Sequence, residues 1–110
     1  MAPRLAVTVG DPRGIGPEVV GKALGAPLAA EVTLVGSREP GAGLSEEAAG
    51  RVAGEAIEEA VRLAVSGQVD AIVTGPVHKK ALHTAGYRYP GVTEFLAHLA
   101  GDVPVAMMLT

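Results

Sequence analysis

Short apolar runs rich in Val, Ile and Leu alternate with helical patterns along this chain. In order, the pattern predicts strands over residues 5–9, 31–35, 70–73 and 103–109, and helices over 17–24, 46–65, 77–85 and 93–98. Strands that alternate with helices are typical of an α/β fold, in which a mostly parallel sheet has helices on both faces. No helix follows the last strand, so we expect another part of the chain or another subunit to cover that edge.

The composition limits the size and the core of the domain. A chain of 110 residues has room for one domain, which commonly contains about 100–150 residues, and we expect no complete second domain. Hydrophobic residues make up 48% of the chain and aromatic residues only 3%. The core must therefore consist mainly of Ala, Val, Leu and Ile side chains.

The charge and the absence of cysteine exclude several classes of protein. The formal net charge is −3 and the Lys and Arg residues are scattered, unlike the basic stripe of a nucleic-acid-binding protein. Without cysteine there is no disulfide and no thiolate metal site, which is typical of a reducing compartment. The first apolar run is too short for a signal peptide or a membrane span. We expect a cytoplasmic protein with neither nucleic-acid nor membrane partners.

A glycine-rich segment, GDPRGIGPE at residues 10–18, follows the first predicted strand. Gly14 and Gly16 would let backbone N–H groups approach a ligand, and the helix that follows favours an anion such as phosphate. The spacing matches neither a dinucleotide-binding loop nor a nucleotide-triphosphate loop. An ordinary tight turn, with Glu18 beside the positive end of the helix, explains the segment equally well.

Two further segments offer groups for an anionic ligand. In TGPVHK at residues 74–79, Thr74 has a hydroxyl, Gly75 allows close backbone approach and Lys79 supplies a cation. For a lysine such as Lys79, a solvated position on a helix is the commoner outcome. Thr93 begins the last predicted helix, either as an ordinary N-cap or with its hydroxyl turned toward a substrate.

The histidines do not predict a metal site. His78 and His83 are five residues apart and would point to different helix faces, whereas Glu94 and His98 are four apart and would form an exposed helix pair. We expect no metal site made from the residues of this chain alone.

Taken together, segments 10–18, 74–79 and 91–95 resemble the 4-hydroxythreonine-4-phosphate dehydrogenase family, and segment 106–109 resembles the strand that comes next in it. The resemblance implies a two-domain α/β/α architecture of the isocitrate/isopropylmalate-dehydrogenase type. Residues 1–110 would form its amino-terminal α/β portion. It also implies a homodimer whose active site lies in the cleft between domains.

The resemblance implies an activity of vitamin B6 biosynthesis. Enzymes of this family oxidise 4-phosphohydroxy-L-threonine with NAD, and the β-keto acid then loses carbon dioxide to give an aminoketone phosphate. A divalent metal such as zinc, magnesium or cobalt polarises the reacting oxygen. Thr93 is the substrate contact that carries over, and Asp11, Gly14 and Lys79 extend the predicted substrate site. No catalytic or cofactor-binding residue is assigned.

Several positions depart from the family. Val92 stands where the family has a histidine that touches substrate, and Arg13 stands where it usually has a small residue. The stretch between Gly36 and Ser45 is shorter than usual. Because the metal-binding histidines and most NAD and phosphate contacts lie downstream of the matched region, we expect this chain alone to be inactive.

Two alternatives remain open. One is a dehydrogenase of a related phosphorylated sugar acid, favoured by Arg13 and Val92. The other is a non-catalytic module for dimerisation or for regulation of a longer relative.

Overall fold

The computed structural model describes residues 2–36, 43–102 and 104. Its sheet consists of β1 (Arg4–Thr8), β2 (Glu31–Val35) and β3 (Ala71–Thr74). All three strands are parallel, and their order is β2-β1-β3. The α/β class is thus confirmed, and each of these strands lies within one residue of its predicted range. The predicted strand over 103–109 lies outside the described residues, apart from Pro104.

Four helices accompany the sheet: α1 (Gly16–Leu24), α2 (Glu46–Val65), α3 (Lys79–Thr84) and α4 (Val92–Leu99). The bounds of α2 agree with the prediction, because apolar residues recur at helical spacing along it. Ser45 caps this helix: its Oγ accepts a hydrogen bond of 3.1 Å from the N–H of Ala48. Gly86 (φ 102°) directly follows Ala85, the C-cap residue of α3. A glycine in the left-handed conformation commonly ends a helix at this position.

The α3 helix begins later than predicted. Pro76 and Val77 stay in the preceding loop, and His78 is the N-cap with an extended backbone. Its Nδ1 accepts a hydrogen bond of 3.3 Å from the N–H of Ala81. A histidine ring therefore performs the capping that a Ser or Asp side chain usually provides.

The prediction of Thr93 as the N-cap of α4 is wrong. Gly91 is the N-cap, with φ −168° and ψ −177°, so Thr93 is the second residue of the helix. The extended backbone of Gly91 allows the helix to start earlier than the sequence indicated. The predicted pairing of Glu94 with His98 is also wrong, because His98 Nδ1 pairs with Asp102 Oδ1 at 2.9 Å.

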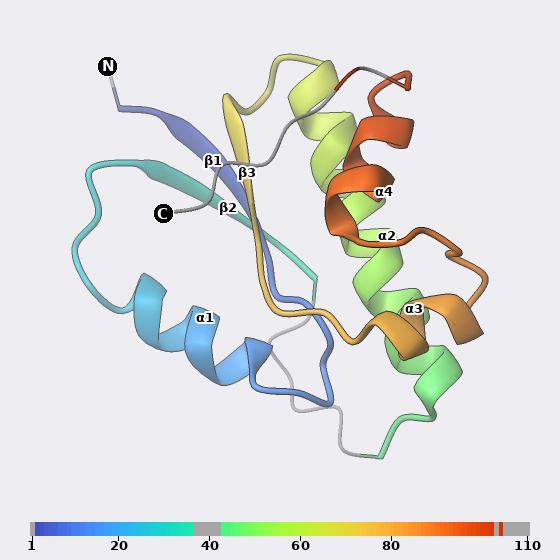
Figure 1. Ribbon diagram of the computed structural model, residues 1–110. Coiled ribbons are helices and arrows are strands. Elements are labelled where there is room, and N and C mark those ends of the chain that lie inside the picture. Colours follow the sequence, from blue (N-terminus) through green and yellow to red (C-terminus); the bar gives the residue numbers. More distant parts are fainter. Residues whose placement is uncertain (1, 37–42, 103, 105–110) are drawn as a thin grey trace.

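Helices lie on both faces of the sheet (Figure 1). On one face, Ala6 and Val35 pack in a buried cluster with Ala56, Ala60 and Leu63 of α2. The α3 and α4 helices pack on that side too, whereas α1 lies against the opposite face (Figure 1). The α1 helix connects β1 to β2 on one side of β1, and α2 connects β2 back to β3 on the other side. Because both crossovers are expected to be right-handed, these opposite directions place the two helices on opposite faces of the sheet.

The aromatic residues of the chain form one cluster that holds α4 to α2. The ring centroids of Tyr87 and Tyr89 lie 5.2 Å and 4.6 Å from that of Phe95. The Tyr87 hydroxyl donates a hydrogen bond of 2.8 Å to Glu58 Oε1 of α2. A side chain on Gly54 of α2 would overlap the Tyr87 ring. The pKa of Tyr87 is raised to about 12, mainly because the hydroxyl is partly buried and secondly because of the Glu58 carboxylate.

Candidate functional site

The loops after β1 and β3 lie at the carboxyl ends of neighbouring strands (Figure 1). The chain leaves β1 through α1 to reach β2 on one side, and it returns through α2 to reach β3 on the other side. The strand order therefore reverses beside β1. Open α/β sheets bind ligands outside the carboxyl ends of the strands at such a reversal.

Backbone contacts join the two loops closely. The N–H of Asp11 donates to the carbonyl oxygen of Pro76 at 2.8 Å, and the N–H of Gly75 donates to that of Thr8 at 2.8 Å. Gly10 has φ 89°, and any side chain there would overlap the Pro76 carbonyl. The fold itself therefore needs glycine at position 10, and the two loops form one continuous rim.

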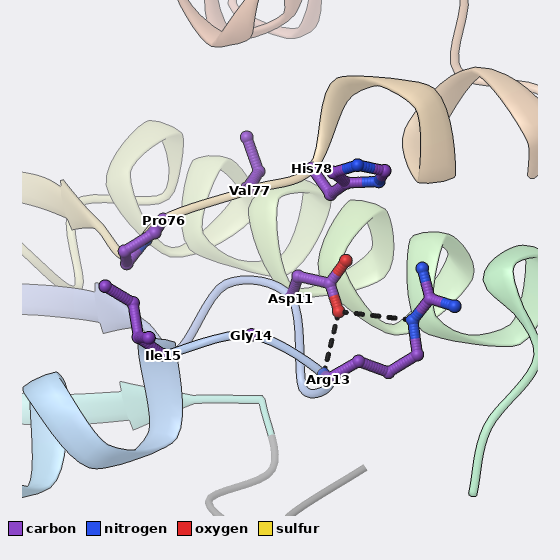
Figure 2. Close-up of a pocket in the computed structure, with 7 residues that line it drawn as sticks. All are labelled: Asp11, Arg13, Gly14, Ile15, Pro76, Val77 and His78. Carbon is purple, nitrogen blue, oxygen red and sulfur yellow. Dashed lines mark hydrogen bonds and ion pairs between the residues drawn. The ribbon is translucent and has the colours of Figure 1, made fainter. Parts of the chain in front are cut away.

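A pocket of about 400 Å³ lies between these loops. Figure 2 shows the residues that line it: Asp11, Arg13, Gly14, Ile15, Pro76, Val77 and His78. Two of the predicted substrate residues, Asp11 and Gly14, thus meet in one pocket with three residues that follow β3. The pocket combines polar groups from both loops with apolar side chains such as Ile15, which is 62% exposed.

Asp11 is the buried polar group of this pocket, with 5% of its surface exposed. Its Oδ1 accepts the backbone N–H of Arg13 at 2.8 Å and lies 3.8 Å from the Arg13 Nε. Its carbonyl oxygen accepts the N–H of Gly14 at 3.0 Å. Asp11 therefore shapes the loop and positions the Arg13 side chain (Figure 2).

Arg13 and His78 are the pocket residues that can donate hydrogen bonds from their side chains to an anion. The Arg13 side chain is 28% exposed, and only its Nε is near Asp11 in the described contacts. A guanidinium offers further N–H groups in one plane, which suits a carboxylate or phosphate. Because His78 Nδ1 accepts the Ala81 N–H, the neutral ring carries its proton on Nε2 and can donate it to a ligand.

The two glycines of the first loop have different roles. Gly14 lines the pocket, and its N–H is already bonded to Asp11. Gly16 is buried, and a side chain there would overlap the carbonyl oxygen of Val9. Gly16 therefore serves the packing of α1 against the end of β1. The expectation that both glycines open the backbone to a ligand does not fit Gly16.

Lys79 and Thr93 do not line this pocket. Lys79 begins α3, and its Cε lies 3.9 Å from the position that a Cβ on Gly91 would take. Its side chain thus runs toward the start of α4, the helix that contains Thr93. The four predicted substrate residues therefore do not lie together: Asp11 and Gly14 line the pocket, whereas Lys79 and Thr93 lie near the start of α4. A role for Lys79 and Thr93 in substrate binding stays a prediction.

From the sequence, Arg13 was expected to favour a sugar acid but was not counted among the substrate-binding residues, and His78 was not assigned to the site. Their position was the available signal, since each follows a strand at the carboxyl edge of the sheet within a few residues. Among the described residues, no three His, Asp or Glu side chains lie close enough together to hold a metal ion. None of the described helices has the length and apolar character needed to span a bilayer.

The chain is similar to proteins of known name and fold. The family profile described as "Pyridoxal phosphate biosynthetic protein PdxA" matches residues 18–110. A protein of Synechocystis sp. named 4-hydroxythreonine-4-phosphate dehydrogenase is 36% identical over 144 residues, covering 96% of this chain and 41% of that protein. A protein of Pectobacterium atrosepticum named D-threonate 4-phosphate dehydrogenase is 33% identical, covering 99% of this chain and 48% of that protein.

A solved structure has the same fold. The crystal structure of a 4-hydroxythreonine-4-phosphate dehydrogenase from Burkholderia phymatum matches with a TM-score of 0.82 and 31% identity, over 92% of this chain and 44% of that chain. The predicted isocitrate-dehydrogenase-like fold is confirmed. The chain spans less than half the length of these relatives. The predicted shortening between Gly36 and Ser45 falls mainly on residues 37–42, outside the described part.

Proposed function

Since the chain belongs to the pyridoxal phosphate biosynthetic protein PdxA family, we propose that its pocket is part of the substrate site of a dehydrogenase for a phosphorylated four-carbon hydroxy acid. The first candidate substrate is 4-phosphohydroxy-L-threonine, as in the name of the Synechocystis relative. A homodimeric state, a cytoplasmic location and the use of NAD and a divalent metal belong to the same proposal.

The observation that carries this proposal is the pocket at the reversal of strand order, with Arg13 and His78 on its rim. The substrate has two anionic groups, a carboxylate and a phosphate. Arg13 binds one of them through its guanidinium, and the Nε2–H of His78 donates to a second oxygen. Asp11 acts through Arg13 as a positioning residue, since it fixes both the backbone and the side chain of Arg13.

In the proposed reaction, the C3 alcohol loses its hydroxyl proton and a hydride from carbon, which leaves a carbonyl group. The hydride goes to NAD. The product is a β-keto acid. Its bond between C2 and the carboxyl carbon breaks to release carbon dioxide, and C2 then takes up a proton. Because the described residues do not cluster as metal ligands, we assign no step to a metal held by this chain. We expect the chain alone to bind substrate without turning it over.

A second candidate substrate is D-threonate 4-phosphate, as in the name of the Pectobacterium relative. This acid has a hydroxyl where phosphohydroxythreonine has an ammonium group. The Arg13 guanidinium in the pocket repels an ammonium group and does not repel a hydroxyl. Arg13 therefore favours the sugar acid, provided that its guanidinium faces the C2 substituent.

Calorimetric titration of each acid into the purified chain tests the proposal. We expect binding of at least one acid, and a loss of at least about tenfold in affinity for Arg13→Gln, as for a charge-assisted contact of about 1.5–3 kcal/mol. Arg62→Gln is the matched control, because Arg62 pairs with Glu59 on the exposed surface of α2. Absence of binding by both acids, or equal losses in the two variants, would refute the assignment of the pocket.

Turnover is measured separately as NADH formation with either acid, NAD and added zinc or magnesium. No NADH from a chain that binds substrate is the expected result. Turnover by the chain alone would contradict the expectation that the remaining half of the fold is required. The acid that binds with the higher affinity in the calorimetric titration is then the preferred candidate substrate.

A further inference from the structure

Two groups compete for the ring nitrogen Nδ1 of His78. The backbone N–H of Ala81 donates to it at 3.3 Å, which caps α3. Glu46, the first residue of α2, has its carboxylate oxygen Oε1 3.9 Å from the same Nδ1. A neutral Nδ1 accepts the Ala81 N–H, whereas a protonated Nδ1 can only donate, which suits the Glu46 carboxylate. The two contacts therefore belong to different protonation states of the ring.

The charged groups around His78 come from the loop after β1, from α2 and from α3 itself. Among the described residues they are Asp11, Arg13, Glu46, Lys79 and Lys80. Asp11 is bonded to Arg13, so Glu46 is the carboxylate that faces the ring. In the view of Figure 2, the His78 ring lies on the same side of the pocket as the Arg13 guanidinium. An anionic ligand bound there adds negative charge beside the ring, which favours the protonated imidazole.

We infer that binding of the anionic substrate is accompanied by uptake of one proton from solvent at Nδ1 of His78. The ring then donates from Nε2 to a substrate oxygen and from Nδ1 to Glu46, and it gives up its hydrogen bond from Ala81. Glu46 is thus a positioning residue, which acts on the substrate through the His78 ring. This inference rests on the proposed function, because it takes the pocket to be the substrate site.

The uptake of a proton makes the affinity for substrate depend on pH. A ligand that binds together with one proton loses affinity as the pH rises, by at most about tenfold per pH unit. Carboxylates, lysines and arginines ordinarily keep their charge between about pH 7 and pH 8, and a phosphate monoester is mostly dianionic above about pH 6. Imidazole is the side chain that ordinarily changes charge near neutral pH. A fall in affinity over this interval therefore indicates a histidine.

Calorimetric titration of 4-phosphohydroxy-L-threonine and of D-threonate 4-phosphate at about pH 7 and at about pH 8 tests the inference. We expect the affinity of wild type to fall about three- to tenfold between these pH values. His78→Asn keeps a good capping side chain but takes up no proton, so its affinity should change by less than about twofold. Nitrogen NMR of the ring gives a second readout: on addition of ligand to wild type, His78 should change from a proton on Nε2 alone to protons on both nitrogens.

Glu46→Gln tests the positioning role, with Glu47→Gln as the matched control. Both substitutions remove a negative charge from the first turn of α2, but Glu47 pairs with Arg51. We expect the pH dependence to shrink to less than about twofold in Glu46→Gln and to stay at the wild-type size in Glu47→Gln.

Binding by wild type with the same affinity at both pH values would overturn the inference and leave the proposed function intact. A pH dependence that persists in His78→Asn, or one of equal size in Glu46→Gln and Glu47→Gln, would also overturn it. Absence of binding by both acids would overturn the proposed function and this inference with it.

Discussion

Gly14 and Gly16 lie two residues apart in the same loop, and the structure predicts different responses to alanine. A Cβ on Gly16 would lie 2.1 Å from the carbonyl oxygen of Val9, whereas real Cβ atoms essentially never approach closer than 3.0 Å. The end of β1 or the start of α1 would have to move by about 0.9 Å. Since the obstructing atom belongs to the backbone, we expect Gly16→Ala to cost about 2–3 kcal/mol, at the upper end of the usual range for overpacking.

Gly14→Ala is the matched control for this prediction. A Cβ at position 14 would lie 3.6 Å from the carbonyl oxygen of Asp11, an ordinary contact, and Gly14 has no positive φ. We expect its free energy of unfolding to stay within about 0.5 kcal/mol of wild type. Urea unfolding followed by circular dichroism measures both variants, and thermal unfolding should show a fall of roughly 8–20 °C for Gly16→Ala. Equal stability of the two variants would refute the reasoning.

Three further predictions concern stability. The Arg4 side chain and backbone N–H hold the pKa of Asp70 below its usual value, so this contact stabilises the fold above about pH 4 and is lost as the pH falls below that value. The difference in urea midpoint between wild type and Asp70→Asn should therefore shrink below about pH 4, and a constant difference would contradict the pairing. Tyr87→Phe removes the hydrogen bond to Glu58 and should lower the free energy of unfolding by about 0.5–1.5 kcal/mol. Because the pKa of Tyr87 is raised from 10.0 to about 12, wild type should lose this extra stability as the pH rises between those two values. Extra stability of wild type that persists in urea unfolding above pH 12 would show that the hydrogen bond is not its cause. Ser45→Ala removes the cap of α2 and should cost about 1 kcal/mol by urea unfolding, whereas an unchanged midpoint would exclude a capping role.

The elements that follow from local patterns were predictable from the sequence. The α2 helix has the same bounds as predicted, because its apolar spacing and its Ser45 cap act within a few residues. The caps of α3 and α4 were not predictable in this way. Capping by the His78 ring depends on its rotamer. Capping at Gly91 depends on an extended backbone, which is only one of the conformations that a glycine can adopt.

The position of the pocket was predictable, because topology alone determines it. Asp11 and Gly14 line a pocket with Pro76, Val77 and His78 because the loops after neighbouring parallel strands meet at one edge of the sheet. The roles of individual side chains depend on tertiary contacts that have no local signal. Examples are the ion pair that orients Arg13 and the direction of Lys79 toward Gly91.

The proposed function depends above all on substrate binding between the loops after β1 and β3. Amide chemical-shift mapping of the ¹⁵N-labelled chain, titrated with 4-phosphohydroxy-L-threonine and then with D-threonate 4-phosphate, tests it most directly. We expect saturable shifts centred on Gly14, Ile15, Val77 and His78, which line the pocket. Saturable shifts centred elsewhere, or no shifts with either acid, would contradict it.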